Sequence, residues 1–158
     1  MAQQASDLSK ESLKRIIQEG DARELVLQAE TLGTKFGKKK GRDSPVTTNQ
    51  IRAIFGTVRQ IEMNWPIRTS QDKQDEQKEK EQREKAERAK RSLMLLKPKV
   101  VYRAARERAP EFKQFAQVVT ESVDMVLADG GDTRQRFGYF VDFFEAMMAY
   151  HKAASEER

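Results

Sequence analysis

The stretch TTNQIRAIFGTVRQIEM, residues 47–63, shows most clearly what kind of fold this chain adopts. Its apolar residues recur every three or four positions, which places them on one face of an α-helix. They are Ile51, Ile54, Phe55, Val58 and Ile61. Thr47 and Gln50 form a capping-box pair at its start. The sequence NWP at 64–66 predicts its end, because a residue that precedes proline disfavours the helical conformation. The stretch therefore predicts an amphipathic helix with one face in a core.

Helical periodicity also marks the chain before this stretch. Residues 21–33, DARELVLQAETLG, predict a helix that Asp21 caps and Gly33 ends. A shorter helix is expected over about 13–17, and Gly20 separates the two. No strand-like alternation of apolar and polar residues is found.

Towards the C-terminus, three more apolar stripes have helical spacing. One helix is expected from Leu93, and Pro98 should kink it or begin a new one. The next begins at Pro110 and ends before the turn Asp129-Gly130-Gly131, and the last begins near Asp132. The three stripes are Leu96, Val100 and Ala104; Phe112, Phe115, Val119, Val123 and Val126; and Phe137, Phe140, Val141, Phe144 and Met148.

Residues 70–92 form a charged segment that interrupts this apolar pattern. Between 71 and 91 no apolar residue is larger than alanine. Glutamates precede lysines or arginines by four positions, as in Glu76–Lys80, and each such pair adds only a few tenths of a kcal/mol to a helix. A coiled coil is excluded because the segment has no apolar seam. A solvent-exposed helical insertion is expected.

Together these patterns predict an all-α fold. We expect residues 1–158 to form a single helical domain, a compact bundle of about five helices with the charged insertion. Residues 1–8 and 153–158 are expected to fray. Gly56, inside the helix of 47–63, suggests a close contact with another helix.

The composition excludes several classes of function. The chain has no cysteine and a single histidine, so it offers no thiolate site and no histidine metal cluster. We find no nucleophile–base pair, and therefore expect no enzyme, no metal and no cofactor. His151 is interpreted as a hydrogen-bonded packing residue, and Asp129 and Asp132 as caps. No apolar run could span a bilayer, and a cytoplasmic location is expected.

Positive charge is concentrated in the middle of the chain. Residues 35–42, KFGKKKGR, carry five positive charges and no negative one, whereas both ends of the sequence are acidic. A phosphate polymer is the simplest partner for this distribution. The glycines let the loop follow a surface, and its lysines suit phosphate contact without base reading. The loop residues singled out are Lys38, Lys39 and Lys40.

Two helices add to this loop. Arg52 and Arg59 lie two turns apart along the edge of the apolar face of 47–63, so they continue the line of the loop. Lys99, Arg103 and Arg106 share one face of the later helix. Tyr102 beside them could stack on a base, but core packing is the expected role. Ordinary solvated surface charge is the alternative for each group.

Three segments together resemble one known family. They are VTTNQIRAIFGTVRQIE at 46–62, LMLLKPKVVYRAARER at 93–108 and RFGYFVDFFEAMMAYHK at 136–152. In this order they resemble the small subunit of the type III-A CRISPR interference complex, the Csm complex. The likeness covers about 21–152 and is weakest at 66–92.

The resemblance implies a non-catalytic RNA-binding subunit in antiviral defence. Copies of it would stack along the guide RNA and the target RNA, and contact other subunits of the complex without reading sequence. It implies RNA contacts at Arg52, Lys97, Lys99 and Arg106. The charge pattern alone adds Lys38, Lys39, Lys40, Arg59 and Arg103. The alternative is a helical protein-interaction adaptor with no RNA role.

Overall fold

The helix of 47–63 begins as its sequence predicts. The Thr47 hydroxyl accepts a hydrogen bond from the Gln50 N–H (3.2 Å), and the Gln50 side chain accepts one from the Thr47 N–H (2.8 Å). These bonds satisfy two donors that a helix start leaves unpaired. The helix, α3, spans Thr48–Met63, ends at the C-cap Asn64 and buries Ile51, Ile54, Val58 and Ile61. The predicted amphipathic helix is confirmed.

The computed structural model describes residues 8–67, 69–70 and 74–156. These residues contain six named α-helices and no strand, which confirms the all-α class. Besides α3 the helices are α1 (Lys10–Ile17), α2 (Ala22–Gly37), α5 (Glu76–Arg106), α6 (Pro110–Leu127) and α7 (Thr133–Ser155). None of the described helices is long and apolar enough to cross a membrane. The expected fraying of the termini lies largely outside the described residues; within them, Leu8 packs against the core and Ala154 is buried.

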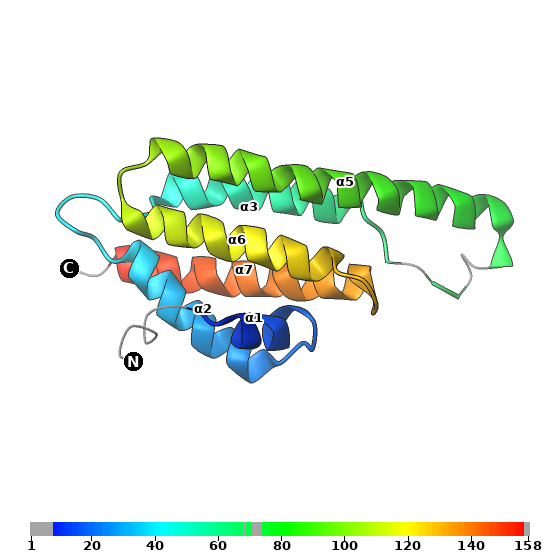
Figure 1. Cartoon of the computed structure of the whole chain (residues 1–158), viewed down its shortest axis with the longest axis horizontal. Helices are drawn as coiled ribbons and strands as arrows, with labels where there is room; N and C mark the ends of the chain where they lie inside the picture. Colours follow the sequence, from blue (N-terminus) through cyan, green and yellow to red (C-terminus); the bar gives the residue numbers. More distant parts are fainter. Residues whose placement is uncertain (1–7, 68, 71–73, 157–158) are drawn as a thin grey trace.

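The long helices lie lengthwise beside one another. Figure 1 shows α3, α5, α6 and α7 side by side, with α2 and the short α1 packed below α7. The pair α2 and α7 makes the most extensive helix contact, and α5 packs mainly on α6. Gly20 separates α1 from α2 as predicted, in a left-handed conformation (φ +68°) that favours glycine.

Phenylalanine side chains fill the centre of the bundle. Seven of them are at most 1% exposed: Phe36, Phe112, Phe115, Phe137, Phe140, Phe143 and Phe144. Phe115 meets Phe36 edge-on, with ring centroids 5.7 Å apart, and Phe144 in the same way at 5.8 Å. The predicted stripe of α7 is confirmed except at its end. Met147 is the fully buried methionine, and Met148 is only partly buried.

Two glycines allow α2 and α7 to approach closely. A Cβ atom on Gly33 would lie 2.5 Å from the Met147 carbonyl oxygen, and one on Gly37 would overlap the His151 carbonyl. The prediction that Gly33 ends its helix is therefore wrong, because α2 continues for one more turn to Gly37. The suggested close contact at Gly56 is also wrong, since nothing lies within 4 Å of a Cβ placed there.

Helix α5 is longer than any other described helix and only partly packed. It enters the core through Leu93, Leu96, Val100 and Ala104, as predicted, and burial begins one turn earlier at Ala89. Pro98 lies inside this continuous helix and begins no new one. We call residues 76–88 the spur; none of them is buried, although Ala86 packs partly against the core, and Figure 1 shows the beginning of α5 projecting beyond the bundle.

The glycine contact leads to a paired test. Gly37→Ala should lower the free energy of unfolding by about 2–3 kcal/mol, because the methyl group must push α7 away from α2. Gly56→Ala should raise it by about 0.5–1 kcal/mol, since alanine favours a helix and meets open space. Urea unfolding followed by circular dichroism measures both values. Equal effects of the two variants would contradict the close crossing.

The spur leads to a second test. Replacing residues 70–81 with a short Gly-Ser linker should reduce helical signal but shift the unfolding temperature by less than about 4 °C, because none of the side chains that the structure describes in this range is buried. Differential scanning calorimetry measures the shift. A fall of more than about 10 °C would show that the spur supports the core.

Candidate nucleic-acid interface

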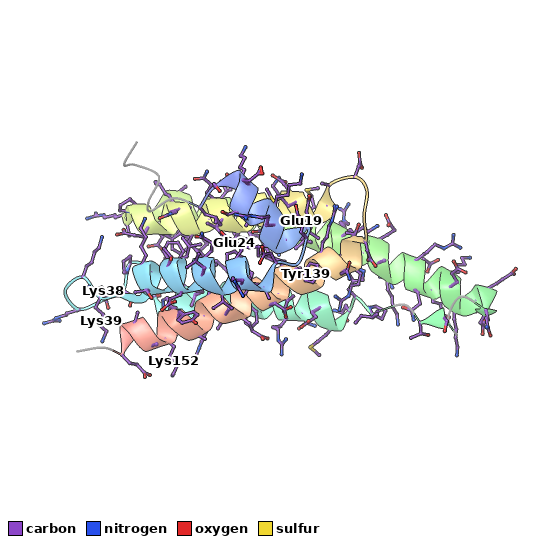
Figure 2. The ribbon with its side chains drawn as sticks, turned by 90° about the horizontal axis from the view of Figure 1, so that it is seen from below. Glu19, Glu24, Lys38, Lys39, Tyr139 and Lys152 are labelled. Atoms are coloured by element: carbon purple, nitrogen blue, oxygen red, sulfur yellow. The ribbon has the colours of Figure 1, made fainter. Side chains whose placement is uncertain are left out.

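One end of the bundle brings together four segments that are distant in sequence. The Gln50 amide donates a hydrogen bond to Glu107 at the end of α5 (2.8 Å). Lys40 pairs with Glu111 at the start of α6, and His151 near the end of α7 contacts the Val46 carbonyl (2.6 Å). We call this region the loop end. It lies at the left of Figure 1, and Figure 2 shows Lys38, Lys39 and Lys152 there.

The base of the cationic loop is held from both sides. The Val46 N–H donates to the Phe36 carbonyl (3.1 Å), and the Val46 carbonyl accepts from the buried His151. A carbonyl can only accept, so Nε2 of His151 carries the proton. The Ser44 hydroxyl donates to the Gly37 carbonyl (2.5 Å). These bonds confirm His151 as a hydrogen-bonded packing residue and fix where the loop joins α3.

The tip of the loop, in contrast, faces solvent. Lys38, Lys39, Gly41 and Arg42 are exposed, and Gly41 adopts a left-handed conformation (φ +82°). The Lys40 N–H donates to the carbonyl of Asp43 across the turn (3.0 Å). The loop therefore presents its positive charges on a short turn with an anchored base.

The loop end is strongly basic. Its segments, residues 35–52, 103–113 and 152–156, contain eleven cationic residues and only four carboxylates. The cations are Lys35, Lys38, Lys39, Lys40, Arg42, Arg52, Arg103, Arg106, Arg108, Lys113 and Lys152, and the acids are Asp43, Glu107, Glu111 and Glu156. The excess of seven charges exceeds the net charge of the whole chain, +5. Such a surface attracts a polyanion.

Three of the predicted RNA-binding residues are engaged inside the protein. Lys40 pairs with Glu111 and Lys97 with Asp124. The Arg59 guanidinium lies 2.8 Å from Glu62 and 3.3 Å from Glu145, and 5.6 Å from the centre of the Phe55 ring. The other six have no carboxylate partner within the described part of the chain: Lys38, Lys39, Arg52, Lys99, Arg103 and Arg106.

The surroundings of Arg59 are acidic. Burial raises the pKa of the Asp142 carboxyl, and the nearby charge of Glu62 adds to this rise. Glu145 lies on the same side, on α7. A phosphate placed here would face three carboxyl groups, so the local field disfavours it.

The basic residues of α3 and α5 do not form one continuous line. Gln50 marks the side of α3 that faces α5, whereas Arg59 contacts Glu145 on α7. On α5, Arg103 and Arg106 are exposed in the last turn, beside the loop end. Arg52 therefore lies nearer the loop than Arg59, which is two turns further along the same side of α3 and faces α7. Arg103 and Arg106 lie near the loop on the α5 side.

Tyr102 lies on the surface and not in the core. We expected core packing, but its side chain is 61% exposed. The Arg106 guanidinium donates to its hydroxyl (3.1 Å) and lies 5.7 Å from the ring centre. Tyr102 lies on the outer face of α5, because it follows the buried Val100 by two positions and a step of two residues leads to the other side of a helix.

Part of this surface could not be predicted from the sequence. Arg108, Lys113 and Lys152 also belong to the loop end, but they are separated by up to 44 positions along the chain. No local pattern connects them, and only the packing of helix ends does. No group of three or more potential metal-ligating side chains occurs in the described residues.

The Lys40–Glu111 pair predicts a specific dependence of stability on pH. The hydrogen bond that the Glu111 carboxylate accepts from Lys40 is the main cause of the lowered pKa of Glu111. A carboxyl group with a lowered pKa stabilises the fold above its unfolded pKa, about 4.3, and this contribution is lost as the pH falls through the folded value. Glu111→Gln should therefore flatten the fall in unfolding temperature between about pH 5 and pH 3.

The expected contribution is below about 1 kcal/mol, because Lys40 is largely exposed. Glu121→Gln, a half-buried glutamate on the same helix, is the matched control. Thermal unfolding at several pH values measures the difference, and identical profiles for wild type and Glu111→Gln would contradict the pair's role.

The chain was compared with known proteins and with models of protein families. Neither curated proteins nor solved structures give a match. A family model described as Csm2 Type III-A matches residues 19–157, which is most of the chain. This match includes all three segments on which the resemblance was based. The chain belongs to the Csm2 family, the small subunit of the type III-A Csm complex.

Proposed function

We propose that this subunit of the type III-A CRISPR effector complex binds the backbone of the guide and target RNA through its loop end, without reading sequence and without catalysis. The observation that carries the proposal is the excess of seven positive charges on this one end of the bundle. Further copies of the chain and other subunits of the complex would supply the remaining length of the RNA surface.

The exposed cations divide by their proposed contribution. Lys38, Lys39, Arg52, Arg103 and Arg106 are exposed, lie near the loop and have no carboxylate partner in the described residues, so they are the primary contacts. The secondary contacts are Lys40, Arg59, Lys97 and Lys99. The first three must give up a carboxylate before they bind phosphate, and this cost reduces their gain.

The chemistry of the loop favours backbone contact over base reading. Lysine is a flexible point charge, whereas reading a base edge needs groups held in a fixed plane. Each phosphate that a cation neutralises releases condensed counterions, which favours binding most at low salt. The anchored base at Val46 and Ser44 limits the conformational entropy that the loop loses on binding.

A protein-interaction adaptor without an RNA role is the alternative. Such an adaptor would leave the loop-end charges without a partner. Clustered like charges raise the energy of the folded state, so a cluster without a partner would only destabilise the protein. The apolar face of α5 described below does favour protein contacts, but it lies apart from the loop tip.

A charge-matched pair of variants tests the RNA role. The double variant Lys38→Gln, Lys39→Gln should weaken binding of unrelated single-stranded RNAs by similar factors. It should also reduce the slope of log K against log salt by about 0.7 for each lost phosphate contact. Fluorescence anisotropy titrations of the subunit, alone and within the assembled complex, measure both quantities.

The control is Lys78→Gln, Lys80→Gln on the spur, which removes the same charge from another exposed region. It should leave the slope unchanged. Equal effects of the two double variants would mean that net charge alone, and not the loop, determines RNA affinity.

A further inference from the structure

The outer face of α5 carries an apolar stripe that no part of the described chain covers. Met94, Leu95, Val101 and Tyr102 are 46–61% exposed, and Pro98 lies exposed between them. We call these five residues the outer stripe. Four of the eight large hydrophobic residues exposed in the described chain lie in this stretch of nine positions. Such clustering marks an interaction surface more often than isolated exposed residues do.

The spacing of the stripe fits a second helix. Three of its residues, Met94, Pro98 and Val101, and the neighbouring Ala105 follow one another at intervals of four, three and four, which is the spacing of a helix–helix seam. At ~100° per residue they lie about 130° around the helix from the buried stripe of Leu93, Leu96 and Val100. Helix α5 is therefore apolar on two faces, and the bundle uses only one of them.

The charges around the stripe are of one sign. Between Arg88 and Arg106, helix α5 has seven cationic residues and no carboxylate. Arg91 lies in line with the stripe, and Lys99 lies along its border. A surface that covers the apolar residues must therefore bring carboxylates to its edge, because unpaired cations beside a desolvated contact are unfavourable.

We propose that the outer stripe docks an amphipathic α-helix of a companion protein of the complex, with acidic residues beside its apolar seam. This inference rests on membership of the family and on the exposed residues of α5, and it does not require the loop end to bind RNA.

Two other occupants fit the stripe less well. A sugar–phosphate backbone would pair with the cations, but it offers no apolar strip for Met94, Leu95 and Val101. A second copy that packed α5 against α5 in two-fold symmetry would bring the cations at the stripe, Arg91 and Lys99, towards cations of the same kind on its partner. An acidic, apolar helix satisfies both the apolar and the cationic parts of the surface.

A matched pair of double variants tests the docking surface. The variant Leu95→Gln, Val101→Gln removes two exposed apolar side chains from α5. The variant Val26→Gln, Leu27→Gln does the same on α2, where Val26 is 46% exposed and Leu27 is 55% exposed. Each variant is expressed with the companion subunits and guide RNA, and the affinity-purified complex is quantified by native mass spectrometry. The α5 variant should associate about tenfold more weakly, and the α2 variant should be retained.

The carboxylates proposed for the docked helix have their own test. Arg91→Glu should weaken association with the complex in the same assay, whereas Arg83→Glu on the spur should not. Circular dichroism and RNA anisotropy of the isolated variants separate docking from folding and from RNA binding. An α5 variant that folds and binds RNA normally but leaves the complex supports docking even if the loop variants show no RNA effect.

A photo-crosslinker identifies the occupant directly. A benzophenone side chain at position 101 in the assembled complex should form its adduct with a companion protein, in a helical segment that carries carboxylates. An adduct with RNA or with a second copy of this chain would overturn the proposal. Equal retention of both double variants would also overturn it.

Discussion

The close crossing of α2 and α7 is the constraint on which the functional end of the molecule depends. Gly33 and Gly37 have no side chains, so the backbone of α2 lies directly on the backbone of α7 at Met147 and His151. At this distance His151 reaches the Val46 carbonyl, 105 positions away in sequence. The beginning of α3 and the base of the cationic loop are thereby fixed relative to the end of α7. A wider crossing would move His151 away and leave a buried carbonyl without a donor.

The packing of the helices concentrates positive charge at one end of the molecule. The chain carries a net charge of only +5, and its two ends are acidic in sequence. Because helix ends that carry cations meet at the loop, the structure separates these charges from the carboxylates that would neutralise them. Where cations and acids do meet they are paired, as at Arg59 and Glu145 beside α7 and at Lys40 and Glu111 at the loop end. Location in the fold, more than residue type, decides which cations remain available for a partner.

The helices could be predicted from sequence because burial repeats at the helical period, and caps such as Thr47 and Asp132 act locally. The close approach at Gly33 and Gly37 could not, because a glycine at a helix end and one at a helix crossing look alike without the partner helix. The same limit explains Gly56. The basic loop was recognisable from its composition, but the ion pairs of Lys40 with Glu111 and of Lys97 with Asp124 join residues 71 and 27 positions apart. Tyr102 was assigned to the core because α5 has apolar residues on two faces, and a single sequence does not say which face is covered.

Pro98 has a consequence for the polar groups of α5. Proline has no N–H, so the carbonyl oxygen of residue 94, one turn earlier, lacks the donor that a regular helix would supply. In the free protein, water can satisfy this oxygen because the surrounding face is exposed. Any element that covers this face must bring a hydrogen-bond donor to that point, or leave room for a water molecule. An apolar seam alone would allow a docked helix to slide along it, whereas a donor on that helix that meets this acceptor would fix its register.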